Sequence, residues 1–126
     1  MPKSVPALPG IPPGNLPFSK VVEANGFVFI AGQIGDAPGS NGPVPGGIEA
    51  ETRQMLDNVG ALLRAVGLDY ADVVRCTVYI VEFDDFFTMN TIYREYFTGD
   101  LPARATVQVV RLALGARIEI EVTAAR

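Results

Sequence analysis

The spacing of apolar positions predicts two amphipathic helices. In residues 48–66 the apolar side chains recur at the spacing of one buried helical face, and Gly67 follows in the position where helices often end. A second helix is predicted over residues 86–97, with Asp84 or Asp85 as its N-cap. The two stripes consist of Met55, Leu56, Val59, Leu62, Leu63 and Val66 in the first helix, and of Phe86, Met89 or Asn90, Tyr93 and Phe97 in the second.

Stretches rich in β-branched residues predict three strands before the second helix. Val21-Val22 and residues 27–31 flank Asn25-Gly26, which is a strong signal for a tight hairpin turn. Residues 73–81 form the third predicted strand. In this strand we expect one buried face, made of Val74, Cys76, Val78 and Ile80.

Two further strands are predicted at the end of the chain, over residues 104–110 and 117–124, around a loop at residues 112–116. The last strand alternates cleanly, because Ile118, Ile120 and Val122 point one way and Glu119, Glu121 and Thr123 point the other. The resulting element order predicts an α+β fold with a mixed sheet and both helices on one face.

The remaining segments predict irregular structure around this sheet. Residues 1–17 hold six prolines and are expected to form an irregular arm, while residues 35–47 hold five glycines and three prolines and are expected to form a surface loop. The face of the sheet without helices would expose Val73, Tyr79, Val81 and Val107. Such an apolar face predicts an oligomer.

The composition of the chain limits the classes of protein to which it can belong. A length of 126 residues with 48% hydrophobic content fits one compact domain over residues 1–126. The net charge is −4 and the cations are scattered, which argues against a nucleic-acid partner. No stretch is long and apolar enough to span a bilayer, and the N-terminus lacks the pattern of a secretory signal, so we expect no membrane partner and a cytoplasmic location.

The chain contains no histidine and a single cysteine, Cys76. This composition excludes the Ser-His and Cys-His nucleophile pairs and the usual imidazole metal ligands, so no metal site is expected. Cys76 is interpreted as an inert core thiol. Carboxylates are therefore the default candidates for any acid–base chemistry in this chain.

Arg104 and Glu119 are the candidate reactive pair. The planar fork of an arginine holds a carboxylate in one orientation, and a nearby carboxylate can handle a proton or a water. The alternative is a structural ion pair. If the last two strands form a hairpin, Arg104 lies opposite position 123 and Glu119 lies about 13 Å away along the strand. That spacing favours a small ligand between them. Glu121, on the same face as Glu119, is placed to raise the pKa of Glu119 by like-charge repulsion.

Several blocks of the sequence resemble the Rid (YjgF-type) reactive-intermediate deaminases from about residue 15 to residue 126. The blocks are Pro17-Phe18-Ser19, Ala31-Gly32-Gln33-Ile34, Gln54 with Leu56-Asp57-Asn58-Val59, Val74-Arg75-Cys76-Thr77-Val78-Tyr79, Asn90 with Tyr93 and Tyr96-Phe97, and Pro102-Ala103-Arg104 with Ile118-Glu119-Ile120. Each block alone is a weak signal, but their order and spacing together are specific.

The resemblance implies a chorismate-mutase-like α+β fold, a homotrimer with ligand clefts between subunits, and hydrolysis of enamines and imines such as 2-aminoacrylate and 2-iminobutanoate to 2-keto acids and ammonia. It implies no cofactor and no metal. Carried over by position, Arg104 clamps the substrate carboxylate and Glu119 holds and activates water. The same comparison implies a cleft lined by Phe18, Ala31, Gly32, Asn90, Ala105 and Thr106.

Three positions depart from the pattern of the resemblance. Phe18 stands where many deaminating members carry Tyr, Ala31 where they carry Ser, and Thr106 where they often carry Cys. The loss of two hydroxyls at Phe18 and Ala31 predicts a more apolar cleft. The alternatives are a specialised degradative deaminase of the 2-aminomuconate type, a non-catalytic trimer that binds small carboxylates, and a ribonuclease, which the acidic balance disfavours.

Overall fold

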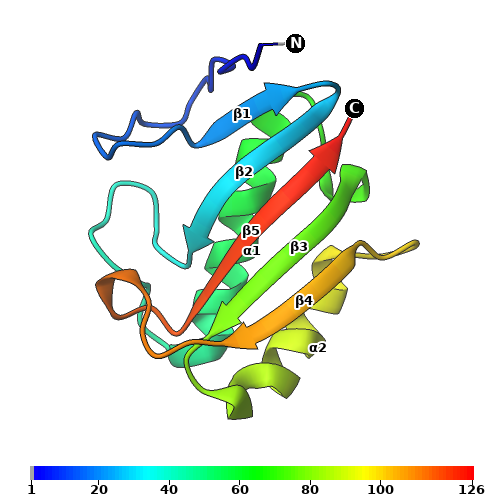
Figure 1. The fold of residues 1–126 in the computed structure, drawn as a ribbon. Helices are drawn as coiled ribbons and strands as arrows, with labels where there is room; N and C mark the ends of the chain where they lie inside the picture. Colours follow the sequence, from blue (N-terminus) through cyan, green and yellow to red (C-terminus); the bar gives the residue numbers. More distant parts are fainter. Residues whose placement is uncertain (1) are drawn as a thin grey trace.

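The computed structural model describes residues 2–126 and shows a five-stranded sheet whose far face in Figure 1 is covered by two helices. The sheet has the order β1-β2-β5-β3-β4. The elements are β1 (Val21–Ala24), β2 (Phe27–Ile34), α1 (Gly47–Ala65), β3 (Val73–Ile80), α2 (Phe86–Tyr96), β4 (Ala103–Gln108) and β5 (Ile118–Ala125). The α+β class and the placement of both helices on one face are therefore confirmed.

The predicted helical stripes form the core between the helices and the sheet. All six apolar positions of the α1 stripe are buried, and so are Met89, Tyr93 and Phe97 from the second stripe. Gly67 ends the first helix with φ 82°, and the amide of Leu68 donates to the Leu63 carbonyl at 2.9 Å.

The hairpin between β1 and β2 is confirmed. Asn25 and Gly26 both have positive φ, 54° and 80°, as a two-residue primed turn requires. The turn fixes the register Ala24 opposite Phe27. It thereby sets which β2 side chains face the helices.

The last two strands do not form a hairpin, so the spacing of Arg104 and Glu119 that was calculated on that condition does not apply. β5 lies between β2 and β3 and is antiparallel to both, while β4 runs parallel to β3 at the edge of the sheet. The reason is the α2 segment, which returns the chain to the end of the sheet where β3 began and so makes β4 parallel. Glu119 pairs with Tyr79 in this register and not with a residue of β4.

The buried face of β3 contains Val73 in place of Val74. Val73 is 6% exposed and Val74 is 43% exposed. The pairing of β3 with β5 shifts between Val73 and Arg75, so an irregularity at this point breaks the simple alternation that the sequence suggested. Cys76, Val78 and Ile80 are buried as predicted.

Asp85, one of the two predicted residues, occupies the N-cap position of the second helix, but its side chain makes no capping hydrogen bond. Asp84 and Asp85 lie in a 3-10 turn, Phe83–Asp85, that leads directly into α2. Asp85 already has helical angles, φ −75° and ψ −9°, whereas a capping residue has an extended backbone. Its buried carboxylate accepts hydrogen bonds from the Arg117 side chain at 3.1 and 3.2 Å.

The face of the sheet away from the helices is partly apolar and uncovered in one chain. Phe27 and Phe29 are each 44% exposed and Val107 is 41% exposed. The N-terminal arm protects the outer edge of β1, where Ser4 exchanges two backbone hydrogen bonds with Glu23. No strand within residues 2–126 pairs with the outer edge of β4. In the same residues, no helix is long and apolar enough to cross a membrane.

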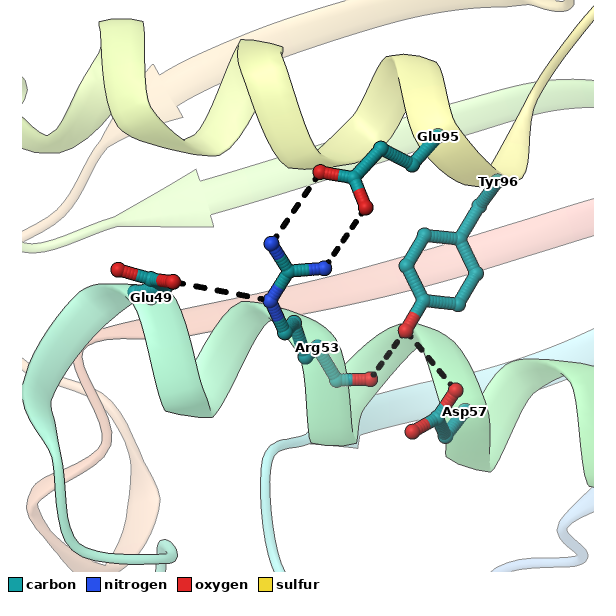
Figure 2. Close-up of polar contacts among 5 residues, drawn as sticks. All are labelled: Glu49, Arg53, Asp57, Glu95 and Tyr96. Atoms are coloured by element: carbon teal, nitrogen blue, oxygen red, sulfur yellow. Dashed lines mark hydrogen bonds and ion pairs between the residues drawn. The ribbon is translucent and has the colours of Figure 1, made fainter.

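A polar cluster joins the solvent sides of α1 and α2 (Figure 2). Arg53 of α1 makes a two-pronged contact with Glu95 of α2, at 2.8 and 3.2 Å. The Tyr96 hydroxyl donates to the Asp57 carboxylate at 2.9 Å and also lies 3.3 Å from the Arg53 carbonyl. Burial and the Asp57 contact raise the pKa of Tyr96 to about 12.

Replacing Tyr96 with Phe should lower the free energy of unfolding by about 1 kcal/mol at pH 7, because the contacts to α1 are lost and the ring remains. A raised pKa in the folded state stabilises the fold fully below pH 10, the ordinary value, and this contribution is lost as the pH rises toward 12. The difference between parent and Tyr96→Phe in urea unfolding should therefore shrink over that window.

Glu49→Gln is the matched control for this prediction. Its carboxylate lies 3.8 Å from Arg53 in the same cluster, with both side chains well exposed, so its loss should change stability by less than about 0.5 kcal/mol. Equal effects of the two substitutions would contradict a specific role for the Tyr96 hydroxyl.

Candidate functional site

Arg104 points toward the helix layer from the edge strand β4. It pairs in register with Cys76, whose side chain is fully buried beneath the helices, and neighbouring partners in a sheet share a face. One terminal nitrogen donates to the Asn90 side-chain oxygen at 2.7 Å. The guanidinium carbon lies 4.7 Å from the centre of the Tyr93 ring. Asn90 and Tyr93 of α2 thus fix the orientation of the fork.

This half of the site has a small cavity beside the guanidinium. Its volume is about 170 Å³, and its lining includes Asn90, Tyr93, Pro102 and Arg104. Ala105 and Thr106 follow Arg104 along the edge strand, and the half-buried Thr106 carries a hydroxyl oxygen that is shielded from solvent and has no hydrogen-bond partner among residues 2–126. The arrangement suits one planar anion, held by the arginine fork.

Glu119 lies on the opposite face of the sheet. Its neighbours in β5, Ile118 and Ile120, are fully buried on the helix side, and strand alternation turns Glu119 away from the helices. The carboxylate rests against Gly32 of β2 so closely that a Cβ atom at Gly32 would overlap its oxygen. A larger residue at this position would push the Glu119 carboxylate out of its present place.

Phe18 and Ala31 lie near this second group. A cavity of about 370 Å³ between the N-terminal arm, the loop after β2 and α1 includes Phe18 and Gly32 in its lining. The Phe18 side chain is 58% exposed. The Ala31 amide donates to the Lys20 carbonyl at 2.9 Å, which ties the start of β1 to the residue before Gly32.

The structure therefore gathers the predicted site residues into two groups. Arg104, Asn90, Ala105 and Thr106 form the arginine half. Glu119 and Gly32 form the carboxylate half, with Ala31 next to Gly32 in β2, while Phe18 lines a cavity that includes Gly32 but not Glu119. Because β3 separates β4 from β5 and the two charged side chains leave opposite faces of the sheet, one chain does not place both around one small molecule. The argument from a hairpin with a ligand between its strands is thus wrong for a single chain.

The pKa of Glu119 is raised above its ordinary value. Burial is the main cause that raises the pKa of Glu119, and the charge of Glu121 raises it further. Glu121 itself accepts a hydrogen bond from the Tyr79 hydroxyl at 2.8 Å. The sequence predicts the repulsion between Glu121 and Glu119. It does not show that burial of the Glu119 carboxylate is the larger cause of the raised pKa.

Sequence reasoning missed the aromatic support beneath Arg104. Tyr93 was assigned to the core only, and its position three residues after Asn90, on the same face of α2, was the available signal. Burial raises the pKa of the Cys76 thiol and keeps it protonated, in agreement with an inert core residue. In the part of the chain described, residues 2–126, no group of three or more potential ligands could hold a metal ion.

Comparisons with known proteins agree on one family. A family model described as "Endoribonuclease L-PSP" matches residues 12–126. The mouse protein named 2-iminobutanoate/2-iminopropanoate deaminase is 45% identical over 108 residues, which cover 86% of this chain and 80% of the mouse protein.

Solved structures of proteins with similar sequences have the same fold as this chain. The Rid family protein YyfA of Yersinia pestis has a TM-score of 0.92 at 36% identity, covering 99% of this chain and 100% of that one. The TdcF protein of E. coli, solved with bound serine, has a TM-score of 0.84 at 34% identity, covering 92% of this chain and 93% of that one.

Removal of the Glu121 charge should lower the pKa of Glu119 and leave it above the ordinary value, because burial is its larger cause. The measurement is a pH titration of glutamate carboxyl carbon signals in parent and Glu121→Gln. Glu82→Gln removes the same charge from an exposed position between β3 and α2 and should leave the Glu119 pKa unchanged. A Glu119 pKa that is the same in parent and Glu121→Gln would contradict the assignment.

Proposed function

This chain belongs to the Rid (YjgF-type) family, which the endoribonuclease L-PSP model describes, and we propose that it hydrolyses imines and enamines of small 2-keto acids to the keto acid and ammonia. The observation that carries the proposal is the Arg104 fork, fixed by Asn90 at 2.7 Å beside a small cavity, in a chain whose relatives are named imine deaminases.

The active site is formed by two copies of the chain. The two charged residues face opposite sides of one sheet, so a complete site needs Arg104 from one copy and Glu119 from another. Exposed Phe27, Phe29 and Val107 on the uncovered face, together with the outer edge of β4, which is unpaired within residues 2–126, support association. A homotrimer ring is the proposed assembly, because a head-to-tail interface that closes gives every copy the same two contacts.

The residues around the two charges complete the cleft. Asn90 orients the guanidinium, and the backbone at Ala105 and Thr106 offers donors along the edge of β4. On the other copy, Phe18 supplies apolar surface in the cavity that Gly32 lines, and Ala31 precedes Gly32 in β2. This surface limits the water that reaches the imine and leaves Glu119 to select the attacking one.

The chemistry needs only proton transfers. For an enamine, the protonated Glu119 donates a proton to the β-carbon, and the electron pair of the C=C bond forms the new C–H bond, which leaves an iminium ion. Water then attacks the iminium carbon and gives one proton to the ionised Glu119. Glu119 returns that proton to the nitrogen, the C–N bond breaks with release of ammonia, and the hydroxyl proton goes back to Glu119 as the keto group forms.

The raised pKa of Glu119 suits this cycle, because the group must act as acid and base in turn. Arg104 neutralises the substrate carboxylate and holds the reacting carbon in place, so the rate gain comes from orientation and charge stabilisation. Ribonuclease activity, which the description of the family model names, is not proposed here: the net charge is −4 and the ten cationic residues are scattered along the sequence.

Glu119→Gln should reduce turnover of 2-iminobutanoate by about a hundredfold or more while 2-oxobutanoate still binds within about threefold of the parent, since the clamp is intact. A coupled assay in which a dehydratase generates the imine, corrected for spontaneous hydrolysis, measures keto acid release. Glu82→Gln is the control of equal charge change. Parent-like turnover by Glu119→Gln would show that Glu119 has no catalytic role. Binding of 2-oxobutanoate by a parent protein that has no turnover above spontaneous hydrolysis would favour the non-catalytic alternative, a trimer that only binds small carboxylates.

Two inactive variants should restore each other when they assemble together. In a ring mixed at random from equal amounts of Arg104→Gln and Glu119→Gln chains, half of the arginine halves and half of the carboxylate halves are intact, so about a quarter of the sites are complete. Unfolding and refolding the mixture should recover about a quarter of the parental activity, provided that light scattering shows the parental mass for each variant alone. If no activity is recovered, Arg104 and Glu119 either act together in the site of a single chain or do not act in catalysis.

A further inference from the structure

A second guanidinium lines the cavity beside Arg104. Arg94 of α2 is in the lining of the cavity of about 170 Å³, together with Asn90, Tyr93, Leu101, Pro102 and Arg104. Arg94 follows Asn90 by four residues and therefore lies on the same face of the helix, one turn or about 5.4 Å further along. Asn90 is the residue that holds the Arg104 fork.

Neither arginine of this cavity is neutralised within residues 2–126. No salt bridge there involves Arg94 or Arg104. The carboxylate next to Arg94 in sequence, Glu95, is bound to Arg53 of α1 (Figure 2). The cavity lining contains two cations and no carboxylate, so the cavity attracts anions beyond the single charge that the clamp needs.

Helix stabilisation alone does not account for this placement. Arg94 lies in the last turn of α2, where a cation interacts favourably with the helix dipole. That effect depends on position along the helix and would be the same on any face. The cavity, by contrast, is lined by Arg94 in particular, with Leu101 and Pro102 as apolar wall.

We infer that the cleft accepts imines of 2-keto dicarboxylic acids, with Arg104 binding the carboxylate next to the imine carbon and Arg94 binding the distal carboxylate. The inference rests on the proposed deaminase function and specifies its substrate class. A cavity of about 170 Å³ is several times the volume of one water, about 30 Å³, and holds a short dicarboxylate. Leu101 and Pro102 contact the methylene groups between the two charges.

The test measures binding of stable product acids, so it is independent of turnover. Titration calorimetry compares 2-oxoglutarate with 2-oxobutanoate on the parent, Arg94→Gln, Arg94→Lys and Arg104→Gln. Gln keeps the helix-forming character and polarity of Arg94 without its charge. Arg64→Gln, the same change on the exposed surface of α1 and outside the cavity, is the matched control.

Arg94→Gln should weaken 2-oxoglutarate binding about tenfold and change 2-oxobutanoate binding by less than about twofold. Arg94→Lys should retain part of the preference because the charge remains, and added salt should weaken 2-oxoglutarate binding more than 2-oxobutanoate binding. Arg64→Gln should change neither.

Two results would overturn the inference: equal binding of 2-oxoglutarate by parent and Arg94→Gln, or equal weakening of both acids. Arg104→Gln separates this failure from failure of the proposed function. If Arg104→Gln loses both acids while Arg94→Gln keeps both, the clamp stands and only the dicarboxylate assignment is wrong. If Arg104→Gln also binds both acids normally, the clamp itself is wrong.

Discussion

Strand alternation combined with strand order is the constraint on which the site depends. Insertion of β5 between β2 and β3 places Glu119 in the middle of the sheet, and burial of Ile118 and Ile120 against the helices turns it to the opposite face. Arg104 sits on the edge strand, in register with buried Cys76, and so turns toward the helices. No side-chain rotation carries either group through the sheet. The backbone arrangement therefore keeps the two side chains apart within one chain, and only a second copy could complete the proposed site.

The sequence predicted the local elements well because local patterns determine them. The α1 stripe, the Asn25-Gly26 turn and the alternation of β5 were confirmed, and each depends on residues within one element. The pairing of β4 was not predictable in the same way, since the sequence of a strand does not indicate which other strand it pairs with. The irregular pairing near Val74 and the partner of Asp85 depend on distant residues, Thr123 and Arg117, and no local pattern shows them.

In the candidate site, too, local sequence patterns identify the individual residues, whereas their arrangement depends on the packing of distant elements. Arg104, Asn90 and Glu119 could be identified from residue type and motif, and the structure shows Asn90 fixing Arg104 and Gly32 making room for Glu119. Their distribution over two faces, the ring support by Tyr93 and the position of Arg94 all required the packing of α2 on the sheet. Apolar Phe18 and Ala31 are consistent with the proposed cleft, in which cations and not hydroxyls would recognise the ligand.

The outer edge of β4 has a consequence for the newly made chain. The arm closes the far edge of the sheet through Ser4, but no strand within residues 2–126 pairs with this edge, and Val107 of β4 itself is exposed on the uncovered face. An open edge next to apolar surface is a template for intermolecular β-pairing. In the proposed assembly this edge would be covered, whereas a chain that has not yet assembled exposes it and is open to aggregation through it.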